Sequence, residues 1–229
     1  MKKPFRLVAL LLAVCLAAPW VFPVGAAAEE GTTHTLADLG SLPDLLAQDK
    51  VKDGDTIRLT GGGAVQTTNE APWIINKSVT ITGGEVYLRA HGILLNADVT
   101  FKDTSITFTS NVRNSIMANG HTLTLENVAC GGHSFNLFCG GLLKSDYETF
   151  DVPAPGQVGR IYIKGNTTLQ YQDTYGSGNI YAGNLCMGGM TESNNGPDQN
   201  GPENVFQGNA VINVEGSGDV GTVYACGAQ

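Results

Sequence analysis

Three short segments of alternating apolar and polar residues recur along the chain at nearly fixed spacing. VTIT begins at Val79, VTFK at Val99 and LTLE at Leu123, so their starts lie 20 and 24 residues apart. A polar turn precedes each segment, and a second short β-prone run or a glycine turn follows it. Alternation with a period of two predicts β-strands, and self-similarity at this period is typical of a solenoid.

A solenoid whose repeat contains strands and no helix is a parallel β-helix. One coil cannot bury its apolar face alone, so successive coils stack and share one continuous core. The unit recurs less regularly at 159–171 and 208–229. The sequence therefore predicts an all-β chain folded as a right-handed parallel β-helix.

The segment SLPDLLAQ, at about 41–48, is predicted to form one short helix. Ser41 is a candidate N-cap and Pro43 falls in the first turn. The first coil of a solenoid exposes an apolar end and unpaired strand edges, so we interpret this helix as a cap. The segment DGDTIRL after it predicts a glycine turn and the first strand. The apolar positions that share one helix face are Leu42, Leu45 and Leu46.

The N-terminus has the pattern of a secretory signal peptide. Lys2, Lys3 and Arg6 precede an apolar run that is followed by small residues, which predicts cleavage near Ala28. Residues 29–229 are then expected to form a single β-helix domain. We expect the protein to be secreted or to lie on the extracellular cell surface, and to meet the membrane only through its signal peptide during export.

The charge of the chain argues against a nucleic acid partner. The full sequence carries 13 basic and 21 acidic residues, a net charge of −8. Removal of residues 1–28 takes away three basic residues and no acidic one, which leaves a net charge of −11. An acidic surface repels phosphate backbones.

Two polar insertions interrupt the repeat, at about 144–158 and 190–204, and are predicted to be loops. Loops of a β-helix leave at the turns and often form its binding face. The final GTVYACGAQ stops after a strand-like run without a capping element. We therefore expect an incomplete C-terminus, with further β-helix coils of a longer parent chain as neighbours.

Four cysteines lie outside the signal segment, namely Cys130, Cys139, Cys186 and Cys226. A Cys130–Cys139 disulfide would close a short loop and stabilise the fold by about 2–4 kcal/mol. Alternatively the cysteines are buried free thiols, because three of them end a strand-like run close to a glycine. Both interpretations stay open. Cys130 and Cys139 with His133 lack the fourth ligand of a structural zinc site, so no metal or cofactor is predicted.

Glycoside hydrolases cleave polysaccharides with clustered carboxylates as acid and base, and lyases use calcium held by carboxylate oxygens together with an arginine or lysine base. Glu85, Asp98, Asp103 and Glu126 are scattered, mostly at turns. The DGD segment at 53–55 fits a glycine turn better than a calcium loop, which needs more ligands. The sequence therefore predicts no catalytic residue.

Aromatic side chains on the flank of a β-helix can stack on sugars. In RIYIK, alternation places Arg160, Tyr162 and Lys164 together on the outer face. Cross-strand packing is an equal interpretation for each aromatic ring. The candidate tyrosines for glycan contact are Tyr162, Tyr171, Tyr175 and Tyr181.

The signal segment, the short helix, DGDTIRL and the Val-Thr coils together resemble the N-terminal part of bacterial pectate-lyase-like right-handed β-helix proteins. GSGNIYAGN and VINVEGSGDVGTVYACG resemble glycine-rich repeats of adhesin-like surface proteins from gut Firmicutes, although the cysteines of LCMGG and YACGA depart from that pattern. This likeness implies a non-enzymatic module that binds glycan or host or matrix components through its loops. A polysaccharide-active lyase or glycoside hydrolase is the alternative, and a structural stalk segment of a larger surface protein is a second one.

Overall fold

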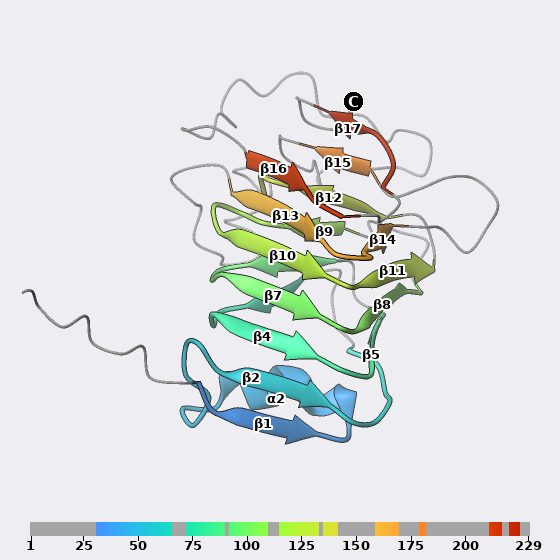
Figure 1. Ribbon diagram of the computed structural model, residues 1–229. Helices are drawn as coiled ribbons and strands as arrows, with labels where there is room; N and C mark the ends of the chain where they lie inside the picture. Colours follow the sequence, from blue (N-terminus) through green and yellow to red (C-terminus); the bar gives the residue numbers. More distant parts are fainter. Residues whose placement is uncertain are drawn as a thin grey trace, which may run out of the picture. The chain divides into compact units, whose positions relative to one another are not determined.

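The computed structural model describes residues 31–65, 72–89, 92–109, 115–132, 135–141, 159–169, 179–181, 211–216 and 220–224. Over these ranges the strands form three sheets in which every pairing is parallel (Figure 1). No helix in the same ranges is long and apolar enough to cross a membrane. The architecture is the parallel β-helix that the repeat predicts.

Sheet A runs the length of the described stack, and its register confirms the alignment of the repeats. Val79 pairs with Val99, and Val99 pairs with Leu123. The strands of sheet A, in spatial order, are β1 (Thr33–Leu36), β2 (Thr56–Leu59), β4 (Val79–Thr82), β7 (Val99–Lys102), β10 (Thr122–Glu126), β13 (Arg160–Lys164) and β16 (Val211–Val214).

Sheets B and C complete each coil, and four successive coils, which begin with β4, β7, β10 and β13, contribute a strand to all three sheets. Sheet B contains β5 (Glu85–Leu88), β8 (Ser105–Phe108), β11 (Ala129–Gly132) and β14 (Thr168–Leu169). Sheet C contains β3 (Trp73–Ile75), β6 (Ile93–Leu95), β9 (Ser115–Met117), β12 (Asn136–Phe138), β15 (Asn179–Tyr181) and β17 (Val223–Tyr224).

The core is built from rows of inward-facing apolar side chains that repeat from coil to coil. Alternation within each strand of sheet A sends every second residue inward, and register then stacks these residues along the solenoid. Sheet C differs because Leu94, Met117 and Phe138, on its outer side, are buried as well. The central row of sheet A consists of Ile57, Ile81, Phe101, Leu125 and Ile163.

The corner that follows sheet A uses one left-handed residue in each of four coils. Gly83, Asp103, Asn127 and Gly165 come directly after β4, β7, β10 and β13 and have φ of 72°, 48°, 54° and 62°. Glycine, aspartate and asparagine tolerate this conformation best. The Asn127 Nδ2 donates to Asp103 Oδ1 at 2.8 Å, so neighbouring corners also bond to each other.

A short helical segment forms at about 41–48, as predicted, but it lies within the first coil, between β1 and β2. The prediction that DGDTIRL holds the first strand was wrong, because β1 comes before the helix and pairs with β2. A 3-10 turn, η1 (Leu39–Ser41), runs into α2 (Leu42–Ala47), with Pro43 in its first turn. The N-cap prediction was wrong in detail, because the Ser41 side chain makes no capping bond and instead donates to Asp38. Asp38 caps η1 by accepting from the Gly40 N–H. The buried positions of this segment are Leu39, Leu42, Leu45 and Leu46.

Candidate functional site

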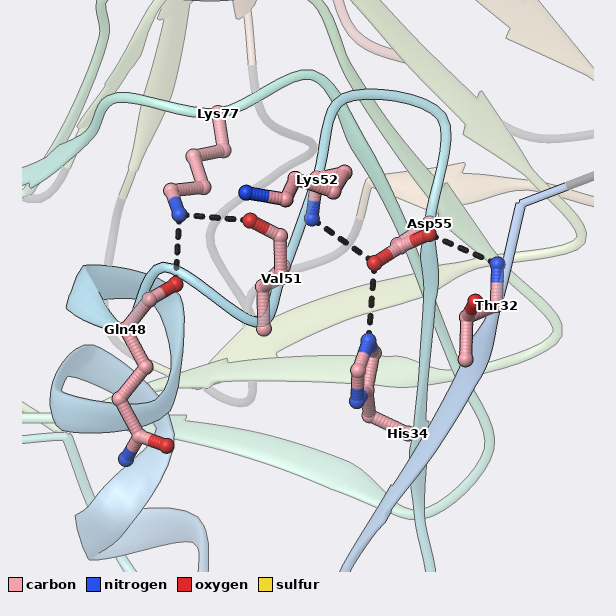
Figure 2. Close-up of polar contacts among 7 residues, drawn as sticks. All are labelled: Thr32, His34, Gln48, Val51, Lys52, Asp55 and Lys77. Atoms are coloured by element: carbon pink, nitrogen blue, oxygen red, sulfur yellow. Dashed lines mark hydrogen bonds and ion pairs between the residues drawn. The ribbon is translucent and has the colours of Figure 1, made fainter. Parts of the chain in front are cut away.

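The DGD segment forms a glycine turn, as predicted, and places Asp55 at the centre of a polar cluster (Figure 2). Asp55 is the only charged side chain that is buried among the described residues. Its carboxylate accepts from the Thr32 N–H at 2.7 Å and from the Lys52 N–H at 2.8 Å. His34 Nε2 lies 2.8 Å from the same carboxylate. These bonds join β1 to the turn before β2.

The environment of Asp55 stabilises its ionised form. The hydrogen bond from the Lys52 N–H, followed by that from His34, lowers the pKa of the carboxyl below its ordinary value. A general acid needs the opposite shift, towards neutral pH. The arrangement of Asp55 and His34 therefore serves to close the first coil, since every bond to the carboxylate comes from a neighbouring segment of the fold.

Lys77 forms a second set of hydrogen bonds near Asp55, which joins the segment before β4 to the end of α2 (Figure 2). Its Nζ donates to the carbonyl oxygens of Gln48 and Val51, at 2.7 Å each. Gln48 is the C-cap of α2, so the ammonium group satisfies a carbonyl that the helix leaves unpaired. The short helix is thus bonded to the coil above it.

The other carboxylates considered for catalysis lie apart from one another. Glu85 faces outward on sheet B and accepts from Thr107, whereas Glu126 lies on sheet A and pairs with Lys102. Asp98 and Asp103 are exposed at the two ends of β7. Among the residues that the structure describes, no three His, Cys, Asp or Glu side chains form a group able to hold a metal ion.

Cys130 and Cys139 are both buried free thiols in the structure. Cys130 lies in β11 of sheet B, in the inward row of Ile106 and Leu169, while Cys139 follows β12 of sheet C. Burial raises the pKa of both thiols, that of Cys139 to about 12. The third proposed zinc ligand, His133, lies outside the described residues, as do Cys186 and Cys226.

The outer face of sheet A presents a regular line of hydroxyl groups, which we call the threonine row. Its five members occupy one register position on five neighbouring strands, so they follow the solenoid axis at intervals of about 4.8 Å. None of their hydroxyls is hydrogen-bonded within the part of the chain that the structure describes. The threonine row consists of Thr33, Thr56, Thr80, Thr100 and Thr124.

A second outward row runs beside the threonine row and carries charge. Lys102 and Glu126 form an ion pair at 2.7 Å, and the hydrogen bond to Glu126 raises the pKa of Lys102. Arg58 and Lys164, at the same register position on β2 and β13, form no ion pair in the described structure. Within the described ranges the face therefore carries cations that have no ion-pair partner, on a chain whose net charge is negative.

Tyr162 continues the threonine row on β13, where it pairs with Thr124. The predicted outward orientation of Arg160, Tyr162 and Lys164 is confirmed, since Ile161 and Ile163 between them are buried. Lys164 Nζ lies 5.7 Å from the centre of the Tyr162 ring, which is a cation–π distance. Thus an aromatic ring, two cations and the hydroxyl row lie together on the outer face of sheet A.

The other candidate tyrosines are not part of this surface as described. Tyr171 and Tyr175 lie outside the described residues, and Tyr181 belongs to β15 of sheet C. The predicted loop insertions at 144–158 and 190–204 also lie outside them. The threonine row was not predicted from the sequence. Its signal was present, because Thr80, Thr100 and Thr124 recur at the second position of the three aligned strands.

Comparison of the chain with protein-family models, with curated proteins and with solved structures finds no match. Function is therefore inferred from the chemistry of the described surfaces. The outer face of sheet A is the candidate site, because within the described residues it combines a row of free hydroxyls with cations that have no ion-pair partner and an accessible aromatic ring.

Proposed function

We propose that this protein is a secreted or cell-surface, adhesin-like β-helix module that binds a linear glycan along the outer face of sheet A. Its action is binding without chemical conversion. The signal-like segment 1–28 supports export. The single observation that carries the proposal is the threonine row with its free hydroxyls.

A hydroxyl group both donates and accepts, as sugar hydroxyls do. A line of five hydroxyls at a constant interval offers equivalent partners to successive units of an extended polymer. Tyr162 adds a ring that can lie against a sugar, with its hydroxyl at the polar edge. Arg160 and Lys164 add charge-assisted hydrogen bonds, which favour a glycan with carboxylate or sulfate groups.

A glycan array tests this proposal. The purified chain is expected to bind linear glycans, with a preference for anionic ones that weakens as salt screens the charges. Tyr162→Ala is expected to remove most of the signal. Tyr87→Ala is the matched control, because Tyr87 is likewise a half-buried, outward-facing tyrosine, but on sheet B. Equal loss in both variants would contradict a site on sheet A.

Incubation of the same chain with polygalacturonate, with and without calcium, separates binding from catalysis. The expected result is retention of the polymer without unsaturated products or new reducing ends. Clear turnover would contradict a non-enzymatic module and favour a lyase or a hydrolase. A failure to bind any glycan on the array would favour a structural stalk.

A further inference from the structure

The outward row beside the threonine row, here called the charged row, changes character from one strand of sheet A to the next. Its members occupy one register position on five neighbouring strands, β2, β4, β7, β10 and β13. Three of the five are cations, and they fall on every second strand. The charged row consists of Arg58, Thr82, Lys102, Glu126 and Lys164.

The cations of the charged row are evenly spaced along the solenoid. Neighbouring strands lie about 4.8 Å apart, so positive charge recurs at about 9.6 Å. Arg160 lies on the same strand as Lys164, so it adds a second cation to that coil and leaves the interval unchanged. The strands in between, β4 and β10, carry no lysine or arginine. An extended polymer along the axis thus meets positive charge at every second coil.

The two positions between the cations favour an uncharged group. Thr82 is partly exposed and presents a hydroxyl, which can donate to and accept from a neutral sugar. Glu126 is the only acidic residue within the described strands of sheet A, and it lies one strand from Lys102 and one strand from Lys164. An anionic group on the coil of Glu126 would therefore lie against a like charge, which is a common way to reject a competing ligand.

Lys102 can bind a ligand although it pairs with Glu126. The side chains of this pair are 43% and 32% exposed, and an ion pair in contact with water is weak. The ammonium group also has three donors, of which one carboxylate oxygen occupies only one. All three cations of the charged row are therefore able to contact an anion.

We propose that the glycan along sheet A is a linear polymer in which an anionic sugar alternates with a neutral one. A pyranose ring linked through opposite positions is about as long as the distance between neighbouring strands, so two sugars match the interval of the cations. The anionic sugars lie at the coils of Arg58, Lys102 and Lys164. The neutral sugars lie at the coils of Thr82 and Glu126. This inference rests on the proposed function, because it names the class of glycan that the same face selects.

Calorimetric titration of the purified chain with three polymers of equal length tests this alternation. The polymers are an unsulfated glycan of alternating uronic acid and N-acetylhexosamine, polygalacturonate with one carboxylate on every sugar, and a neutral glucan, all at one salt concentration. The alternating glycan is expected to bind at least about fivefold more tightly than polygalacturonate, because one like-charge contact at a partly exposed position changes affinity by about that factor. The neutral glucan is expected to bind least tightly.

Two substitutions should narrow this preference. Glu126→Gln keeps the shape of the side chain and removes its charge, so the affinity ratio of the two anionic polymers should fall by about fivefold. Thr82→Lys adds a cation on a coil assigned to a neutral sugar, so the ratio should fall in this variant too. Glu85→Gln is the matched control, because it changes the net charge equally but lies exposed on sheet B, and it should leave the ratio unchanged. Circular dichroism checks that each variant folds.

The outcomes separate this inference from the proposed function. Binding of polygalacturonate or of the neutral glucan as tightly as the alternating glycan would overturn the alternation and leave a glycan site in place. A ratio that neither Glu126→Gln nor Thr82→Lys changes, or that Glu85→Gln changes equally, would overturn it as well. Failure to bind any of the three polymers would overturn the proposed function and this inference with it.

Discussion

Asp55 shows how one residue can close the first coil of a solenoid. Its carboxylate is buried, yet it costs the fold little, because donors from Thr32, Lys52 and His34 replace the water that it loses. Each donor comes from a different position along the first coil. Removing the charge should therefore loosen β1 as well as the turn.

Asp55→Asn should destabilise the protein at neutral pH. The folded-state pKa of Asp55 lies below the ordinary unfolded value of about 3.9. The ionised group therefore stabilises the fold above that value, and the stabilisation is lost as pH falls through the folded-state pKa. Thermal unfolding of the two proteins should converge as pH is lowered. Asp49→Asn, an exposed control, should match the wild type at every pH, and a pH-independent difference for Asp55→Asn would contradict this account.

Cys130 and Cys139 should resist alkylation in the native protein. Thiolate is the reactive form, and burial raises the pKa of both thiols far above neutral pH. In denaturant without reductant both thiols should be alkylated at once. Peptide mass mapping can show which of the two residues carries the label. If both instead stay unlabelled until a reductant is added, the chain holds them in disulfides and the free-thiol state is wrong.

At the scale of elements, the left-handed corners after sheet A explain why the strands can stack with constant register. Asp103 and Asn127 accept positive φ values, and their side chains bond across neighbouring coils. Asn127 Oδ1 also accepts from the Asn166 N–H at 3.1 Å. The corner thus satisfies backbone groups that the strands leave free when the chain turns.

Asn127→Val should lower the free energy of unfolding by about 2–4 kcal/mol, from the lost hydrogen bonds and from left-handed strain. Asn127→Gly loses the same bonds without the strain, so it should cost about 1–2 kcal/mol. Urea unfolding of the three proteins measures the order. Equal destabilisation by valine and glycine would show that the φ value of this corner does not matter.

The elements that the sequence predicts best are those whose side chains alternate. A shift of one residue would turn every apolar side chain of VTIT, VTFK and LTLE outward, so the pattern determines the register. The capping role of Asp38 and the corner residues could not be found in this way, because they depend on contacts made after the chain turns. Likewise Cys130 and Cys139 are nine residues apart in sequence, but Cys130 lies in sheet B and Cys139 comes directly after a strand of sheet C.

At the scale of the whole molecule, stacking converts a local repeat into an extended surface. Each of five successive coils contributes one threonine at the same register position. The five hydroxyls therefore form a line that runs across the strands of sheet A, along the solenoid axis. This surface could be predicted only in part, since the sequence shows the recurring threonine but not which charged residues lie beside it.

The central claim is that the threonine row binds a linear glycan, and calorimetric titration tests it most directly. The ligand is the glycan with the strongest signal on the array, and the variant is the double substitution Thr80→Val with Thr100→Val. Valine keeps the shape and strand preference of threonine but removes the hydroxyl. Loss of two hydrogen bonds of about 0.5–1.5 kcal/mol each predicts an affinity lower by about 5- to 150-fold. An unchanged affinity in a variant that folds like the wild type would contradict the claim.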